Sequence, residues 1–377
     1  MVSMNSRERV WKALNHQIPD RVPLDFGSKG SGLALGAYEE LKKCLRVETP
    51  TQVLDVRLGL AAIDESILER FHIDTRYVYM KASRSWDPKA NPSEDTFVDE
   101  WGATLKRPKD GFYYDHVRFP MKEPSIEAIK RHPWPDPDDP SRYEGLKETA
   151  RSLHEKGYAI GSYIKGSFET TWILRGFEQA LIDLALNQKF YHALADKVSE
   201  ILSRMIENFL NEVGEYLQFL CVTCDLGTQL APMISPTDYR TFVRPYEKRV
   251  FETVKRKSKA KVAQHSCGAI FKLIPDLIES GIEMINPIQT NAKGMDTVLL
   301  KKEFGRDLCF WGGIDAQKIL PYGTSEEVDR EVKRIIRDLS PEGGFLLAPT
   351  HDIQTFTPSE NVITLYQSAL EYGSYVS

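Results

Sequence analysis

A histidine and a cysteine two residues apart, His265 and Cys267, are the strongest candidates for chemistry in this sequence. They stand at the end of an apolar run that is typical of a β-strand, and on a strand residues i and i+2 point to the same side. An imidazole and a thiol placed in this way supply half of a tetrahedral zinc site. A catalytic zinc takes three protein ligands and leaves the fourth position for water or substrate.

The third ligand of such a site has three candidates, His351, Cys224 and Cys309. His351 and Cys224 each fall at the end of another predicted strand, whereas Cys309 comes early in its strand and is expected to lie too far from the ends. The alternative to a metal site is a buried cysteine beside a hydrogen-bonded core histidine.

Further polar and aromatic residues follow apolar runs in the same way. Asp225 precedes a loop rather than a helix, which favours a catalytic role over helix capping. Gln229 and Gln289 are suited to hydrogen-bonding an amide or carboxylate of a substrate. Asp315 either binds substrate or caps the helix that follows it, and Trp172 either forms a pocket wall or packs in the core.

The elements that must position these residues alternate along the chain in a βα pattern. Short β-branched runs are followed by stretches with helical period, which predicts βαβ units and a parallel sheet. The predicted strands are residues 22–26, 75–80, 158–164, 219–225, 260–267, 283–289, 308–315 and 344–351. Eight such units predict one (β/α)8 barrel over residues 1–377, with an N-terminal helix and a β-hairpin excursion within residues 81–120, after the second strand. An open doubly wound sheet is the rival, but no G-x-G-x-x-G fingerprint follows the first strand.

Composition and charge indicate a globular protein of 377 residues with a net charge of −5. Its 49 basic and 54 acidic residues argue against a general nucleic-acid binder. No apolar run is long enough to span a membrane, and charges occupy the place where a signal peptide has its apolar stretch. The 5 cysteines are too few, and odd in number, for a disulfide framework, so we expect reduced thiols and a cytoplasmic location.

Five motifs resemble the uroporphyrinogen decarboxylase superfamily over nearly the whole chain. They are R-E-R-V with P-D-R-V-P at residues 7–10 and 19–23, I-S-P-T-D-Y at 234–239, R-P-Y at 244–246, G-G-I-D at 312–315, and the segment 348–358 around His351. The resemblance implies a (β/α)8 barrel whose active cleft opens at the carboxyl ends of the strands. The superfamily contains two chemistries.

The first chemistry is the decarboxylation of a porphyrinogen without a cofactor, which uses paired arginines in an R-Q-A-G-R motif. Residues 27–32 read G-S-K-G-S-G instead, so the chain lacks the paired arginines that would bind the carboxylates of a polyanionic porphyrinogen. Asp74 matches the aspartate that the decarboxylases use, which makes it a catalytic candidate by resemblance. Trp172 falls where a tyrosine is expected, and Gly227 falls about where a serine is expected.

The second chemistry is cobalamin-dependent methyl transfer between a corrinoid protein and a thiol. These methyltransferases bind zinc through H-x-C and a cysteine from the last strand. His265 and Cys267 match the first two ligands, whereas His351 stands where the third would be a cysteine. By this resemblance Asp225 and Gln229 position the acceptor.

We therefore expect a zinc-dependent methyltransferase that acts on a small molecule and on the corrinoid of a partner protein, with a homodimer as a possible assembly. The alternative within enzymes is a cofactor-independent decarboxylase of a porphyrinogen-like or smaller acid, in which His351 or Asp74 stabilises developing charge. The alternative outside enzymes is a non-catalytic subunit that binds a corrinoid or a metal.

Overall fold

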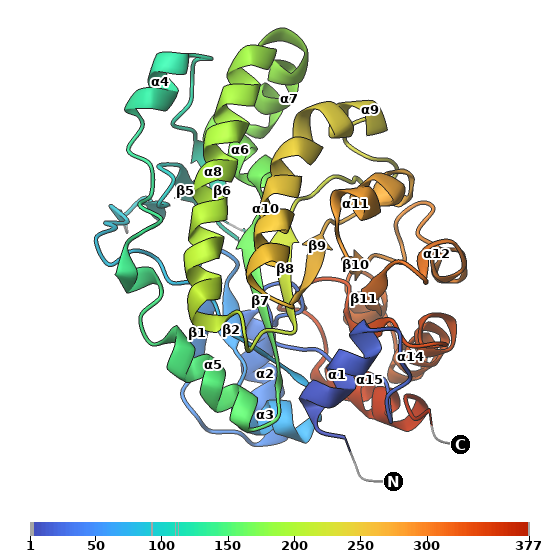
Figure 1. Cartoon of the computed structure of the whole chain (residues 1–377). Coiled ribbons are helices and arrows are strands. Elements are labelled where there is room, and N and C mark those ends of the chain that lie inside the picture. The colour runs from blue at the N-terminus through green and yellow to red at the C-terminus, as the bar shows by residue number, and fades with distance from the viewer. Residues whose placement is uncertain (1–3, 92, 110, 112, 376–377) are drawn as a thin grey trace.

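A curled parallel sheet forms the centre of the computed structural model, which describes residues 4–91, 93–109, 111 and 113–375 (Figure 1). Its seven strands pair in the order β12-β11-β10-β9-β8-β7-β3. Each overlaps one predicted strand, which confirms seven of the eight. In chain order they are β3 (Thr75–Tyr77), β7 (Ala159–Lys165), β8 (Phe219–Thr223), β9 (Lys261–His265), β10 (Met284–Ile288), β11 (Cys309–Ile314) and β12 (Phe345–Pro349).

The eighth predicted strand, residues 22–26, closes the ring with an isolated bridge rather than a ladder. Leu24 pairs in parallel with Leu347 of β12. On its other side the Leu24 carbonyl accepts a 2.9 Å hydrogen bond from the Asp74 N–H, next to β3. Pro23 has no N–H to add to a ladder, which keeps this pairing short. The protein is thus an α/β fold of the TIM-barrel type, as predicted.

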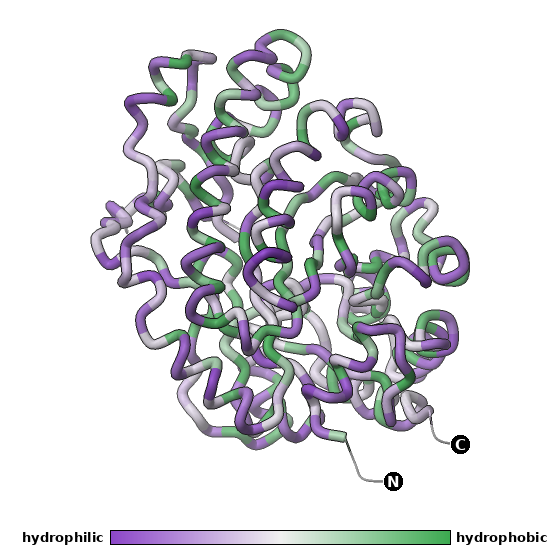
Figure 2. Tube along the Cα trace, viewed as in Figure 1, coloured by the Kyte–Doolittle hydropathy of each residue, from purple (hydrophilic) through white to green (hydrophobic). Residues whose placement is uncertain are grey.

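Helices surround the sheet on its outer side (Figure 1). In α14 the residues Val328, Val332, Ile335 and Leu339 recur at helical spacing and are buried. Figure 2 shows the same division over the molecule, with hydrophobic residues concentrated toward the sheet and hydrophilic ones toward the outside. The helices are α1 (Ser6–Leu14, the predicted N-terminal helix), α2 (Leu35–Leu45), α3 (Glu65–Arg70), α4 (Ile126–Arg131), α5 (Leu146–Glu155), α6 (Ser167–Arg175), α7 (Phe177–Leu186), α8 (Gln188–Val213), α9 (Pro236–Asp238), α10 (Arg244–Lys257), α11 (Ile274–Ser280), α12 (Thr297–Phe304), α13 (Ile319–Tyr322), α14 (Ser325–Leu339) and α15 (Ser359–Tyr372).

Two antiparallel excursions extend from the barrel. The predicted hairpin after the second strand is a three-stranded sheet of β4 (Thr96–Val98), β5 (Thr104–Lys106) and β6 (Asp115–Arg118). A hairpin of β1 (Gln52–Asp55) and β2 (Leu60–Ala62) was not predicted. The two touch, because the Tyr114 N–H donates a 3.0 Å hydrogen bond to the Arg57 carbonyl.

Aromatic side chains fill the interior of the barrel, among them the fully buried Phe219 and Trp311. They surround one buried carboxylate, Asp25, which accepts hydrogen bonds from Tyr77 (2.6 Å), Trp311 (2.9 Å), Ser31 and Thr75. Burial raises the pKa of Asp25, and these four donors oppose the rise. Such a packed interior leaves the strand ends as the place for a site.

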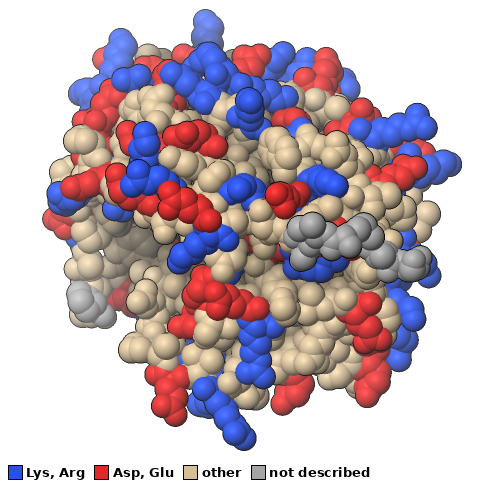
Figure 3. Space-filling model, turned by 60° about the horizontal axis from the view of Figure 1, so that its bottom comes forward, with Lys and Arg blue, Asp and Glu red and all other residues tan. Residues whose placement is uncertain are grey.

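The surface carries both signs of charge. On the face in Figure 3, lysine and arginine are interspersed with aspartate and glutamate. Within the part of the chain that the structure describes, no helix combines the length and the apolar composition that crossing a membrane requires.

Candidate metal centre

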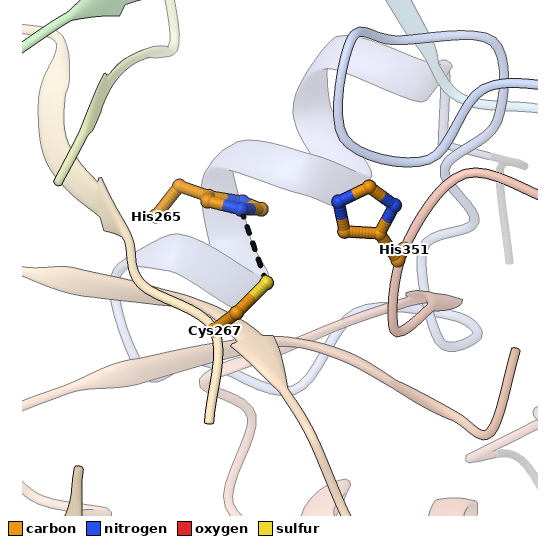
Figure 4. A group of neighbouring side chains, drawn as sticks. All are labelled: His265, Cys267 and His351. Atoms are coloured by element: carbon orange, nitrogen blue, oxygen red, sulfur yellow. Dashed lines mark hydrogen bonds between the residues drawn. The ribbon is translucent and has the colours of Figure 1, made fainter. Parts of the chain in front are cut away.

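The structure brings His265, Cys267 and His351 together at the carboxyl ends of β9 and β12 (Figure 4). One ligand atom from each lies within 4.8 Å of the other two. The His265 Nε2 atom is 3.5 Å from the Cys267 Sγ atom, and the two imidazole rings are 6.0 Å apart between centroids. Ligand atoms around a tetrahedral zinc are separated by roughly 3.3–3.7 Å, given bonds of about 2.0–2.3 Å. Two imidazoles and one thiol, a set that zinc prefers, thus need only small side-chain rotations to share one ion.

The orientation of His265 is fixed by the strand next to it. Its Nδ1 atom lies 2.6 Å from the Oδ1 atom of Asn286, a buried residue of β10. Because an amide oxygen only accepts, Nδ1 carries the proton and donates it. The Nε2 lone pair therefore points toward Cys267, whose thiol is its hydrogen-bond partner, and it is the nitrogen that can bind a metal.

Asp225 supports Cys267 from the end of β8. Its Oδ1 atom accepts a 2.8 Å hydrogen bond from the Cys267 N–H and lies 3.9 Å from His265 Nε2. Burial, and after it the charge of Asp225, raises the pKa of the Cys267 thiol well above its ordinary value. The thiol therefore stays protonated unless a bound cation stabilises the thiolate.

His351 is followed by a second buried carboxylate. Asp352 accepts a 2.8 Å hydrogen bond from the Gly32 N–H through Oδ1, and its Oδ2 atom is 3.8 Å from His351 Nδ1. Among the described residues Oδ2 has no hydrogen-bond partner, and burial raises the pKa of Asp352. The imidazole of His351 is 41% exposed, so this ligand faces open space.

Two cavities flank the three ligands. The charged cavity, of about 430 Å³, is lined by His265, His351, Trp172 and the charged residues Lys29, Asp55, Arg57, Asp99, Lys165, Glu169, Asp225 and Asp352. The outer cavity, of about 620 Å³, includes Cys267, His351, Gln229, Gln289 and Tyr113 in its lining. A larger depression of about 730 Å³, near Arg84 and α5, contains none of the predicted site residues. An ion on the three ligands would face both flanking cavities.

The expected substrate-binding residues are distributed unevenly around this centre. Gln229 and Gln289 line the outer cavity, although the Gln289 side-chain oxygen already accepts a 2.7 Å hydrogen bond from the Gly268 N–H. Trp172 lines the charged cavity, and its buried indole N–H has no partner among the described residues. Asp315 accepts from the N–H groups of Gln317 (2.7 Å) and Lys318 (3.0 Å) in the turn before α13, whose own N-cap is Lys318.

Asp74 is not part of this centre, and its placement corrects our expectation of a catalytic role. It precedes β3 and lies at the amino ends of the strands, whereas His265 ends β9. Fully buried, it forms ion pairs with Arg9 (2.6 Å) and Arg21 (2.8 Å) and accepts from the Leu24 N–H (2.8 Å). These contacts are those of a structural carboxylate that ties the barrel's closing segment to β3.

The other two candidate third ligands also lie elsewhere. Cys224 is buried on the helix side of β8, where the charge of Glu247 adds to the effect of burial in raising its thiol pKa. The Cys309 Sγ atom lies 3.4 Å from the Leu14 carbonyl oxygen, at the amino end of β11. Of the three, only His351 reaches His265 and Cys267.

Sequence reasoning missed several residues of the charged cavity. Lys165 ends β7, directly after a predicted strand, so its position contained a usable signal. Arg57 lies in the turn of the β1–β2 hairpin, and Asp99 follows β4. Those two depend on how the excursions fold back over the barrel, which the sequence pattern does not specify.

Comparison with known proteins places these observations in a family. A family model described as uroporphyrinogen decarboxylase (URO-D) matches residues 114–372, which include all three ligands. The uroporphyrinogen decarboxylase of Prochlorococcus marinus strain MIT 9312 is 24% identical over 243 residues, covering 60% of this chain and 68% of that protein. The enzyme of strain MIT 9211 is 24% identical over 262 residues, covering 63% and 71%.

Among solved structures, a methyltransferase from Methanosarcina mazei has a TM-score of 0.67 at 16% identity, covering 98% of this chain and 99% of that one. At this identity the likeness shows a shared fold. The family model spans more than half of the sequence and includes the strand ends that form the centre. The chain therefore belongs to the uroporphyrinogen decarboxylase family.

Proposed function

We propose that the protein is a zinc-dependent methyltransferase that moves a methyl group between the corrinoid of a partner protein and a thiol or similar acceptor. The observation that carries the proposal is the convergence of His265, Cys267 and His351 between two cavities. Three protein ligands leave one coordination position for an acceptor, which is the pattern of a catalytic zinc.

Each residue of the centre has a distinct task in this proposal. When bound, zinc lowers the pKa of a thiol and so supplies a nucleophile at neutral pH. Asn286 holds His265 Nε2 toward the ion, and Asp225 holds the Cys267 backbone. The acceptor sulfur then takes the methyl group from cobalt, and cobalt keeps the electron pair of the broken bond.

The metal is tested by titrating zinc into the metal-free protein in competition with a chromogenic chelator. We expect one zinc per chain, and we expect Cys267→Ser and His351→Ala each to weaken binding at least ~100-fold, about 2.7 kcal/mol, because a soft thiolate or an imidazole is lost. Cys309→Ser is the matched control, since that thiol lies at the other end of the barrel. Wild-type affinity in Cys267→Ser would end the proposal.

Activity is tested with free methylcobalamin as the methyl donor and a small thiol as the acceptor, followed by the absorbance change of the corrinoid. We expect zinc-dependent demethylation that Cys267→Ser abolishes. Corrinoid binding without any turnover would favour the non-catalytic subunit.

Decarboxylation is the second candidate, because the sequence relatives named above are uroporphyrinogen decarboxylases. The loop of residues 27–32 argues against it, since it lacks the paired arginines and packs tightly. A Cβ atom at Gly30 would lie 2.5 Å from the Tyr163 hydroxyl. We expect no conversion of uroporphyrinogen to coproporphyrinogen near ordinary enzyme rates, roughly 1 per second or faster. Such turnover would replace methyl transfer as the assigned function.

A further inference from the structure

Two cations in the charged cavity have no direct partner within the described part of the chain, although acids of the cavity act on both at longer range. Arg57 and Lys165 both line it, and neither side chain has a hydrogen bond or ion pair with another described residue. Lys29, the third cation, is paired with Asp55 at 3.1 Å. Burial and, after it, the Arg57 charge lower the pKa of Lys165, whereas the charges of Glu169, Asp99 and Asp55 raise it. Like charges in a half-buried place are costly unless an anion joins them.

Two carboxylates of the same cavity, Asp99 and Asp352, are also incompletely satisfied. Asp99 uses Oδ1 to accept from the N–H groups of Trp101 and Ala103, which shapes its turn. Its buried Oδ2 atom has no hydrogen-bond partner among the described residues, and the nearest basic group, His116 Nε2, is 3.8 Å away. Asp352 is in the same state, because its Oδ2 atom lacks a hydrogen bond to any described residue and lies 3.8 Å from His351 Nδ1. The other acids of the cavity are engaged: Asp55 by Lys29, Glu169 by Thr223 and Asp225 by Cys267.

The unsatisfied groups have opposite charges, and this restricts the ligand. A simple anion would pair with Arg57 and Lys165 but would leave the Oδ2 atoms of Asp99 and Asp352 without a hydrogen bond, in a cavity whose five acids outnumber its three cations. A simple cation would leave the two basic side chains unpaired. A ligand that carries both charges can pair with the two cations and with an unsatisfied acid, and it adds no net charge to the cavity.

We propose that the charged cavity binds the head group of a small zwitterionic acceptor, an aminocarboxylate, with its carboxylate on Arg57 and Lys165 and its ammonium on Asp99. His265 and His351 line the same cavity, so the tail of the molecule reaches the metal centre. The inference rests on the proposed function for the thiol at the end of that tail, whereas the head-group site depends only on the cavity.

The test compares three thiols that differ only in the head group. Homocysteine has both charges, 4-mercaptobutyrate lacks the ammonium, and 3-mercaptopropylamine lacks the carboxylate. We expect calorimetry on the zinc-loaded protein to show homocysteine binding at least tenfold more tightly than either of the others. Equal binding of 4-mercaptobutyrate would overturn the proposal in favour of a simple anion site, and equal binding of all three would remove head-group recognition.

Variants assign each charge to its residues. Asp99→Asn keeps the Oδ1 acceptor that shapes the turn, and it should lose the preference for homocysteine over 4-mercaptobutyrate while keeping the other preference. Arg57→Met and Lys165→Met should lose the preference for homocysteine over 3-mercaptopropylamine and keep the preference over 4-mercaptobutyrate. Arg84→Gln is the control, an exposed cation outside the cavity. Variants that retain both preferences would show that the head group binds elsewhere.

The same measurements on zinc-free protein separate this inference from the proposed function. Norvaline, which has the same head group on an apolar tail, should still bind more tightly than valerate or butylamine. If that preference appears in a chain that binds no zinc, the methyltransferase proposal fails and the head-group site stands. If zinc binds and the preference is absent with and without it, the head-group site fails and the metal centre stands.

Discussion

At the scale of single residues, the metal centre depends on how firmly each ligand is oriented. Asn286 accepts the Nδ1 proton of His265 at 2.6 Å and itself lies in the buried sheet. The imidazole therefore has its coordinating nitrogen set before any ion arrives. Support of this kind is usually worth 10–100-fold in metal affinity.

Asn286→Ala tests that support. We expect zinc affinity to fall by about 10–100-fold, because His265 loses both its tautomer and its orientation. Chelator competition measures the change, with the exposed Asn211→Ala as the control variant. Unchanged affinity in Asn286→Ala would mean that His265 does not coordinate through Nε2.

A second buried group at this scale, Glu247, makes stability depend on pH. It is fully buried on α10, where Oε1 accepts from the Ser167 hydroxyl (3.0 Å) and the Phe168 N–H (2.9 Å), and Oε2 has no hydrogen bond among the described residues. Burial raises the pKa of Glu247 to about 7. The folded state therefore binds this proton more tightly than the unfolded chain does, and stability falls as pH rises from about 4.5 to about 7.

Glu247→Gln should remove this dependence. The free energy of unfolding of the variant, relative to wild type, should rise between pH 4.5 and 7 by up to about 3 kcal/mol, at 1.36 kcal/mol for each pKa unit. Urea unfolding at several pH values gives the comparison. A constant difference between the two proteins over this range would show that Glu247 ionises normally.

How far the sequence predicts the site is clearest from individual residues. The i, i+2 spacing of His265 and Cys267 was enough to place both at one strand end, and His351 followed from the position of the last strand. Asp74 was misassigned although the predicted strand began at Thr75, which already put it at the amino end. The sequence pattern could not indicate Arg57 or Asp99, because antiparallel excursions bring them to the cavity through tertiary contacts.

At the scale of elements, a buried ion pair is one of the contacts that fasten the β4–β6 sheet to the rest of the molecule. Arg142, which is buried, makes two hydrogen bonds of 3.0 and 2.7 Å to the Glu100 carboxylate, and Glu100 also accepts from the Ser83 N–H. The sheet supplies Phe97, Asp99 and Leu105 to the charged cavity. The shape of the cavity therefore depends on this pair.

Glu100→Gln should loosen the sheet without unfolding the barrel. Arg142 stays buried and loses its counter-charge, so we expect amide hydrogen exchange in β4–β6 to accelerate at least tenfold, about 1.4 kcal/mol. Exchange in β9 and β10 should stay as slow as in wild type. Glu94→Gln, an exposed site on the same excursion, serves for comparison; equal exchange in the two variants would contradict the anchoring role.

The apolar periodicity of the sequence predicted the fold, and the elements that differ from the prediction do so for local reasons. Seven predicted strands form the ladder because their apolar runs are buried on both faces, as parallel strands require. The first strand is reduced to a bridge around Leu24, where Pro23 interrupts donation. The β1–β2 hairpin was missed because its strands of 4 and 3 residues are too short to show a period.

At the scale of the whole molecule, the closure of the barrel depends on the cluster of Asp74, Arg9 and Arg21. Asp74→Asn removes the carboxylate that neutralises the partly buried guanidinium groups of Arg9 and Arg21. Breaking a buried ion pair of this kind costs about 3–5 kcal/mol. We expect the free energy of unfolding in urea to fall by that amount, with zinc stoichiometry per folded chain unchanged. Normal stability with lost methyl transfer would instead return Asp74 to the active site.

Some residues of the charged cavity lie outside the part of the chain that matches the family model. The matching part, residues 114–372, contains His265, Cys267 and His351. Arg57 and Asp99, on the β1–β2 and β4–β6 excursions, lie outside that match. Under the proposed function, substitutions in these two segments would change which acceptor the cavity admits and leave the three candidate ligands in place, so related proteins that share the H-x-C motif are best separated by comparing residues 52–62 and 96–106.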